Sequence, residues 1–300
     1  MTSKLYLVIA LGACQWGGGP GPGPIGLVID AGKPDAAPKK DASTMRDSAM
    51  GDGRIVDARM IPDAAIDSPV GSTAHLLLTE LCVTPDGSEF IELYNPTAQA
   101  IDLSTYYLSN HGSYFTLPAG VPTLPLAHFI VKFPAGASIA PGGVITVATQ
   151  GAAPFMTTYG APPTYSITDG TMTAVMVNST PRLTDGGALV VLFQWDGTSG
   201  LVKDVDIMIS GIPSMTNVLV DKSGVTQKGM TYATDANTIA AQPSAPGIGQ
   251  STKRIKREDG QEVQTGAGNG LTGHDETSEH TEVTWDSSFS APTPGSVPAL

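Results

Sequence analysis

Histidine and carboxylate side chains are concentrated in one short segment near the carboxyl end of the chain. His274 and His280, two of five histidines, flank Asp275, Glu276 and Glu279. Such side chains are common ligands of divalent metal ions, and a loop that folded back on itself could bind one through His274, Glu279 and His280. No regular element is expected to hold these ligands, so a metal site is not the favoured interpretation of this segment.

A second set of candidate metal ligands lies on an expected strand. Asp204 and Asp206 alternate along it, so both side chains should face the same side of a sheet. With Asp185 or Asp235 they could share a calcium ion, which prefers carboxylate oxygens. A solvated strand face is the simpler interpretation. The sequence therefore predicts no metal site and no cofactor.

Three glutamates near the start of the folded region are candidates for acid and base catalysis. Two carboxyl groups can share this work if burial raises the pKa of one of them, and Glu80, Glu89 and Glu92 are close in sequence. Cross-strand pairing, or hydrogen bonds to the backbone at a sheet edge, explains these glutamates more simply. No histidine lies in an H-E-x-x-H motif and no serine in G-x-S-x-G. We therefore predict no catalytic residue and expect the protein not to be an enzyme.

The two cysteines, Cys14 and Cys82, must form one disulfide or have separate fates. Cys82 lies in the apolar run Leu76 to Val83, where a single cysteine usually behaves as a small buried hydrophobic residue. We therefore expect Cys82 to be chemically inert.

A basic run, Lys253 to Arg257, stands out in a chain whose net charge is −12. Strand alternation would place Arg254 and Lys256 on one face and the other members on the opposite face, which divides the positive charge. Ion pairing with nearby carboxylates is favoured over contact with an anionic sugar polymer or a lipid headgroup. The acidic balance of the chain repels phosphate backbones and disfavours nucleic acid as a partner.

Short strands must position these side chains, because the composition leaves little room for long helices. Glycine and proline make up about a fifth of the chain, against roughly 12% in average usage. Only 15% of the residues are charged, which is typical of an exported β protein. One short helix is expected, over residues 152–159.

Apolar or alternating runs separated by turn signals such as Pro85-Asp86-Gly87 and Asp185-Gly186-Gly187 predict the strands. The expected strands cover 76–83, 89–94, 106–109, 128–133, 144–149, 173–177, 188–195, 202–209, 252–256 and 282–285. Many short strands punctuated in this way are typical of a β sandwich or barrel.

The order of these motifs resembles the lamin tail domain family. Leu78-Thr79-Glu80-Leu81 is followed by Glu89-Phe90-Ile91-Glu92-Leu93-Tyr94-Asn95, which is similar to the family pattern E-[FW]-[IV]-E-[LI]-x-N, and then by Ile101-Asp102-Leu103-Ser104. Thr105-Tyr106 stands where the family prefers Gly-Trp. Later matches are Pro141-Gly142-Gly143, Asp185-Gly186-Gly187 before an apolar strand, and the terminal Thr293-Pro294-Gly295. The resemblance implies an all-β, immunoglobulin-like sandwich over residues 73–300.

The beginning of the chain predicts export and lipid attachment. Residues 1–13 carry one positive charge and an apolar run of seven residues, too short to span a bilayer. Leu11-Gly12-Ala13-Cys14 resembles the lipobox of bacterial lipoproteins, which implies that Cys14 becomes the acylated first residue. Because Gln15 is not the aspartate that retains lipoproteins in the inner membrane in the family pattern, the outer membrane is the implied destination. An N-terminal strand or a misassigned start codon is the alternative.

Between this leader and the strands, residues 14–72 are predicted to form a disordered linker, rich in Gly and Pro and then in Asp and Ala. The sequence as a whole therefore predicts a non-catalytic lipoprotein of the cell envelope that displays a lamin-tail-like binding or structural module on a flexible stalk. Its expected partners are the membrane, through the lipid, and an envelope protein or polysaccharide. The alternatives are a calcium-dependent adhesin and an envelope-polymer hydrolase whose active site is not recognisable.

Overall fold

A computed structural model of the chain describes residues 75–211, 220–233, 242–258, 270–271, 276–286 and 288–300. The predicted leader 1–13, the predicted lipid-attachment residue Cys14 and the predicted linker 14–72 lie outside the described residues. So do His274, Asp275 and Asp235 among the candidate metal ligands. The predictions made for these residues stay predictions.

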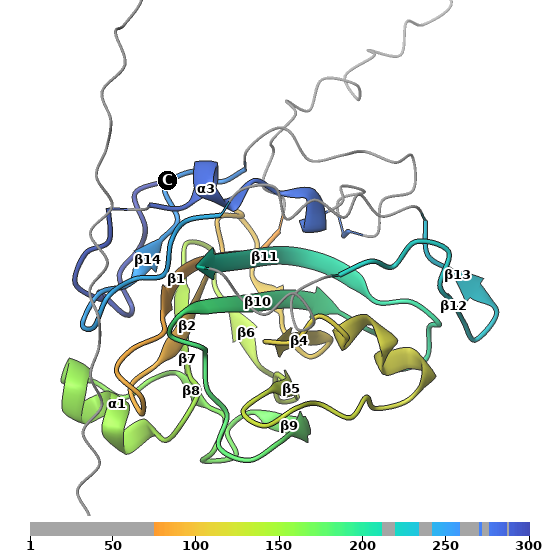
Figure 1. Cartoon of the computed structure of the whole chain (residues 1–300), viewed down its shortest axis with the longest axis horizontal. Helices are drawn as coiled ribbons and strands as arrows, with labels where there is room; N and C mark the ends of the chain where they lie inside the picture. Colours follow the sequence, from red (N-terminus) through yellow and green to blue (C-terminus); the bar gives the residue numbers. More distant parts are fainter. Residues whose placement is uncertain (1–74, 212–219, 234–241, 259–269, 272–275, 287) are drawn as a thin grey trace, which may run out of the picture. The chain divides into compact units, whose positions relative to one another are not determined.

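Two five-stranded sheets dominate the described part of the chain (Figure 1). The first has the order β14-β1-β2-β7-β8 and the second β11-β10-β4-β5-β9. Every pairing in them is antiparallel except that of β7 with β8. Two small ribbons, β12-β13 and β3-β6, complete the strands. The bounds are β1 (Leu77–Cys82), β2 (Phe90–Tyr94), β3 (Ile101–Asp102), β4 (Tyr106–Ser109), β5 (Phe129–Lys132), β6 (Ser138–Ile139), β7 (Val144–Ala148), β8 (Tyr165–Ser166), β9 (Thr173–Val177), β10 (Gly187–Gln194), β11 (Lys203–Gly211), β12 (Thr226–Gln227), β13 (Met230–Thr231) and β14 (Thr252–Lys253).

The main core lies between the two sheets. Alternate residues of each sheet point inward, as the pleat requires, so Ile91 and Val147 from the first sheet pack in the same cluster as Leu108 and Val190 from the second. This arrangement confirms the all-β sandwich that the strand pattern predicts.

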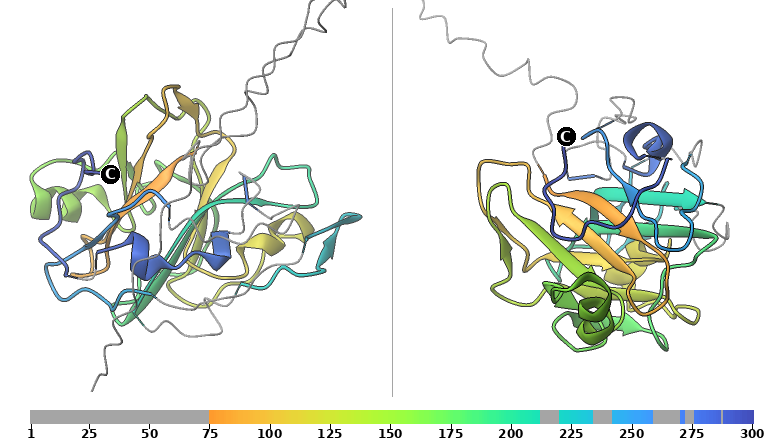
Figure 2. Two further views of the ribbon diagram at one scale, coloured as in Figure 1. Left: turned by 90° about the horizontal axis from the view of Figure 1, so that it is seen from above. Right: turned by 90° about the vertical axis from the view of Figure 1, so that its left-hand side faces the viewer.

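Each sheet is also covered on part of its outer face, which explains why β1 and β10 are buried along most of their length. Helix α1 (Ala152–Tyr159) covers the first sheet, where Phe155 packs against Phe90 with ring centroids 5.7 Å apart. Both views in Figure 2 place α1 beside the first sheet. The short helix η1 (Tyr114–Ala119) covers the second sheet, where Tyr114 packs on Phe193. Strands that are buried on both faces have nearly continuous apolar sequences, and β1 and β10 follow this pattern.

The predicted strand at 282–285 is wrong, because this segment forms a helical turn, α3 (Thr281–Thr284), directly after the short helix η2 (Glu276–Ser278). The β-branched residues favour a strand locally, but tertiary contacts prevail. Thr281 donates a hydrogen bond from Oγ1 to the carbonyl of Ile209 in β11 at 3.0 Å. Trp285, next in the chain, is 1% exposed and joins the main core. The expectation of one helix, at 152–159, is correct for α1 but misses η1, η2 and α3.

Candidate functional site

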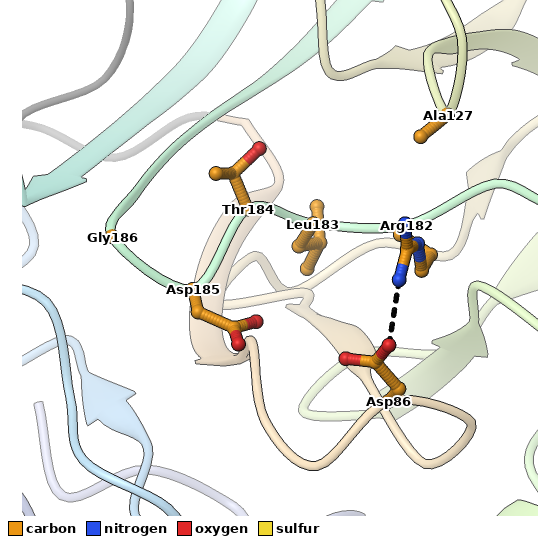
Figure 3. A pocket seen from close by; sticks show the side chains of 7 residues that line it. All are labelled: Asp86, Ala127, Arg182, Leu183, Thr184, Asp185 and Gly186. Carbon is orange, nitrogen blue, oxygen red and sulfur yellow. Dashed lines mark hydrogen bonds and ion pairs between the residues drawn. The ribbon is translucent and has the colours of Figure 1, made fainter. Parts of the chain in front are cut away.

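A polar cavity lies where a turn of the first sheet meets a loop of the second (Figure 3). The β1–β2 turn contributes Asp86, and the loop before β10 contributes Arg182 and Asp185. The cavity has a volume of about 300 Å³ and is open to solvent. In the close-up both carboxylates point into the space between the two loops.

Glycine-containing turns fix the positions of Asp86 and Asp185. In the β1–β2 turn the Ser88 N–H donates to the carbonyl of Pro85 at 3.2 Å, and Gly87 has a φ of +90°, which a residue with a side chain rarely adopts. The second turn approaches Gly211 so closely that a Cβ atom there would lie 2.4 Å from the carbonyl oxygen of Gly186. Gly211 therefore allows the turn that carries Asp185 to pack against the end of β11.

Glu89 is the buried member of this acidic group. Its side chain accepts hydrogen bonds at Oε2 from Thr149 Oγ1 at 2.9 Å and from the N–H of Leu183 at 2.8 Å. Within the described residues Glu89 Oε1 has no hydrogen-bond partner, although Glu89 is 0% exposed. Burial, and to a smaller extent the charges of Asp86 and Asp185, raise the pKa of Glu89 to about 8. One carboxylate oxygen from each of these three residues lies within 4.8 Å of the other two.

Arg182 is the cation at the mouth of this cavity. Its Nη1 lies 2.6 Å from Asp86 Oδ2, and the two side chains are 49% and 55% exposed. An exposed pair of this kind contributes about 0–1 kcal/mol to stability. Arg182 therefore neutralises part of the acidic charge without fixing the loop firmly.

Glu80 and Glu92, two further glutamates considered for catalysis, bind the end of the chain instead. Glu80 Oε1 accepts a hydrogen bond from the N–H of Thr293 at 2.9 Å, and Glu92 Oε2 accepts one from the N–H of Gly295 at 2.6 Å. Thr79 donates to the other oxygen of Glu92 at 3.0 Å. This geometry confirms that hydrogen bonds to the backbone explain these two glutamates, although β1 and β2 lie inside the first sheet and not at its edge.

Asp204 and Asp206 do not form a solvated strand face, and that expectation is wrong. They are 1% and 2% exposed, and each has its own buried cation. Asp204 pairs with Lys222 and accepts a hydrogen bond from Tyr114 at 2.6 Å, whereas Asp206 pairs with Arg254 at 2.5 Å. The β10–β11 register shifts beside these two aspartates, so strict alternation fails there.

Arg254 lies at the centre of a buried network of ion pairs. Its Nη2 binds Asp206, its Nη1 lies 3.3 Å from Glu279 Oε1, and its Nε donates to the carbonyl of Leu78 at 2.7 Å. The guanidinium carbon stands 5.1 Å from the ring centroid of Trp285. The prediction that the basic run makes ion pairs is confirmed for Arg254. Lys253 also agrees, since its Nζ lies 3.9 Å from Glu80 Oε1.

Further acidic side chains surround this network. Among the described residues, two sets of three side chains bring possible metal-ligand atoms within 4.8 Å of one another, and both sets include Glu276. One set adds His75 and Glu258, and the other adds Asp206 and Glu279. Burial and the neighbouring carboxylates Glu258, Asp206 and Glu279 raise the pKa of Glu276 well above its ordinary value. Glu276 lies in η2 and Glu279 follows it, so the expectation that no regular element holds this segment is wrong for Glu276. Both side chains are buried, at 3% and 5% exposed.

Cys82 is buried, as predicted. It packs with Phe90 and Phe155 beneath α1, and burial raises the pKa of its thiol. A buried thiol with a raised pKa is a poor nucleophile.

Two histidines of the described region, His111 and His128, stack edge to face with ring centroids 4.9 Å apart.

Sequence reasoning missed Asp86 as part of a site and missed Lys222 as the partner of Asp204. Both turn signals, Pro85-Asp86-Gly87 and Asp185-Gly186-Gly187, are recognisable in the sequence. Nothing local shows that the two turns meet, because about 100 residues separate them and the contact exists only once the sheets are stacked.

The fold and the polar groups together define an antiparallel β-sandwich module in which most buried charges join one element to another. Residues 69–234 match the family model of the lamin tail domain, and the chain belongs to this family. Its sandwich is of the immunoglobulin-like type that this family implies. No helix in the described part of the chain is long and apolar enough to cross a bilayer.

Comparison with solved structures finds a DUF4876 family protein from Bacteroides thetaiotaomicron VPI-5482. It is 16% identical in sequence, with a TM-score of 0.36, and the match covers 76% of this chain and 72% of that one. Comparison with curated proteins finds no match.

Proposed function

We propose that this protein is a non-catalytic lipoprotein of the outer membrane, which displays its lamin tail domain on a flexible stalk as a binding or structural module. The lipobox-like Leu11-Gly12-Ala13-Cys14 supports the anchor, and the Gly, Pro, Asp and Ala composition of residues 14–72 supports the stalk. Cys14 would carry the lipid. The expected partner is an envelope protein or polysaccharide.

The observation that supports the non-catalytic part is the use of Glu80 and Glu92, two of the three candidate glutamates. A general acid or base must be free to exchange a proton with a substrate within hydrogen-bond reach. Glu80 and Glu92 instead accept hydrogen bonds from the backbone of Thr293 and Gly295, so their carboxylates hold the end of the chain against the first sheet. Cys82, which could act as a nucleophile, is 0% exposed. These groups therefore stabilise the module.

The anchor is tested by labelling cells of a Gram-negative bacterium that express the full chain with radioactive palmitate. We expect label in the protein, accumulation of an unprocessed precursor under globomycin, and recovery in the outer-membrane fraction. Cys14→Ala should abolish all three. Cys82→Ala is the matched control, because it removes the only other cysteine and should still be labelled. A wild-type protein that is soluble and unlabelled would reject the anchor.

The binding role is tested by sedimentation with purified envelope polymers. We expect the protein to sediment with one polymer or envelope protein and to leave the polymer uncut, as judged by the size distribution and by new reducing ends. Release of fragments that requires the folded chain would favour the hydrolase alternative and overturn the non-catalytic assignment.

A further inference from the structure

We infer that Asp86, Glu89 and Asp185 form a site for one divalent cation, best suited to calcium, at the end of the sandwich where the β1–β2 turn meets the loop before β10. The sequence predicts no metal site, so this inference revises that expectation. It goes beyond the proposed display function and is independent of the lipid anchor.

The spacing of the three carboxylates fits one shared ion. Calcium binds oxygen ligands at about 2.3–2.6 Å, so two oxygens on opposite sides of one ion lie at most about 5 Å apart. The three ligand oxygens lie within 4.8 Å of one another. An ion at the centre of three oxygens at this limit is slightly further from each than calcium prefers, so small side-chain rotations of the exposed Asp86 and Asp185 would bring all three ligands into contact.

Glu89 supplies an observation that a surface cluster of acids would not. Its Oε2 is held by Thr149 and by the backbone of Leu183, which fixes the direction of the carboxylate. Its Oε1 is buried and has no hydrogen-bond partner among the described residues, and one oxygen of the same carboxylate lies within 4.8 Å of ligand oxygens of Asp86 and Asp185. A buried polar atom without a partner costs about 1–3 kcal/mol, and more when it is charged. A cation between the three residues would satisfy this oxygen.

The ligand chemistry selects the ion. All three ligands are hard carboxylate oxygens, and the group contains no imidazole nitrogen or thiolate sulfur, which zinc and copper favour. Two ligands come from turns, so the geometry is irregular, which calcium tolerates and magnesium does not. The adjoining cavity of about 300 Å³ is open to solvent. Water molecules there could complete the six to eight ligands of a calcium ion.

Binding would join the two sheets at this end of the sandwich. Asp86 belongs to the turn between two strands of the first sheet, whereas Asp185 precedes the first residue of β10 in the second. Arg182 would compete with the cation for Asp86, because its guanidinium lies 2.6 Å from the Asp86 carboxylate. Removing this positive charge should strengthen binding of the cation.

The test is a titration of the full-length protein with CaCl₂, after removal of metal with EDTA, followed by calorimetry and by thermal unfolding. We expect one calcium to bind and to raise Tm by about 5 °C or more at 100 times Kd, because a ligand bound only to the folded state stabilises it. Glu89→Gln keeps the shape and the acceptor for Leu183, so it should fold but bind calcium at least 10-fold more weakly. Asp185→Asn should do the same and serves if Glu89→Gln does not fold. Arg182→Gln should bind more tightly than the wild type.

Asp102→Asn is the matched control, since it removes an exposed carboxylate of β3 that is outside the group of three. It should bind calcium as the wild type does, even if the aspartates of residues 14–72 add weak sites. A wild-type protein with no heat and no shift in Tm up to 10 mM CaCl₂, roughly the weak end of extracellular calcium sites, would overturn the inference. So would binding that is unchanged in both Glu89→Gln and Asp185→Asn. An equal response to magnesium would overturn the assignment to calcium.

Discussion

Replacing Glu92 by Gln should change how the stability of the domain depends on pH. Glu92 is 2% exposed on β2, and burial raises the pKa of its carboxyl to about 7 from an ordinary 4.5. Glu80, which pairs with it across β1 and β2, raises the pKa further, whereas the hydrogen bonds from Gly295 and Thr79 and the charge of Lys253 lower it. The folded state therefore holds this proton more tightly than the unfolded state.

The sign and size of the effect follow from proton linkage. Below pH 4.5 Glu92 is protonated in both states, so its contribution to stability is fully present. Between pH 4.5 and about 7 the unfolded chain has released the proton and the folded chain has not, so the free energy of unfolding falls as pH rises. A difference of about 2.5 pKa units corresponds to about 3 kcal/mol. Above pH 7 the loss is complete and no further change is expected from this residue.

Gln is neutral at every pH and resembles protonated Glu in shape. Glu92→Gln should therefore match the wild type near pH 4.5 and become more stable than it by about 3 kcal/mol at pH 8. Urea unfolding in EDTA at four pH values between 4.5 and 8 measures the difference. Glu282→Gln, the same change at an exposed position of α3, is the control for the substitution itself. Parallel stability curves for Glu92→Gln and the wild type would refute the reasoning.

Three further substitutions or probes test the rest of the structure. Arg254→Met should lower the free energy of unfolding in urea by about 3–5 kcal/mol, because it leaves Asp206 and Glu279 buried without their cation. Adding Asp206→Asn should recover part of this loss. A change below 1 kcal/mol would show that the network is not buried. Gly211→Ala should cost about 1–3 kcal/mol, since φ is +69° and the new Cβ would meet Gly186, and an unchanged Tm would contradict that close contact. Cys82 should react with a thiol reagent only when the domain unfolds, so its labelling rate should follow urea denaturation, and rapid labelling of the native protein would contradict its burial.

Local signals were sufficient to predict most of the sandwich. The strands β1, β2, β4, β5, β7, β9, β10 and β11 and the helix α1 each coincide with an apolar or alternating run between turn residues. The strand expected over 282–285 is wrong because β-branched residues there favour a strand, whereas contacts with β11 and the burial of Trp285 favour the helical turn α3.

The charged residues were harder to predict than the strands. The pattern places Asp204 and Asp206 correctly on one strand, but the register shift between them breaks the expected alternation, and their burial depends on Lys222 and Arg254, which are distant in sequence. The same limit applies to the site, since Asp86 and Asp185 lie in separate turns and meet only in the folded sandwich. A single sequence indicates which segments favour strands or helices, but it indicates little about which distant residues a charged side chain will contact.

The display of this sandwich on a membrane is tested most directly by the mass of the amino-terminal peptide of protein purified from cell envelopes. We predict a peptide that begins at Cys14 and carries diacylglycerol on its thiol, with residues 1–13 removed. An unmodified peptide that contains Leu7, or one that begins after Cys14, would contradict the lipid anchor and with it the proposed function.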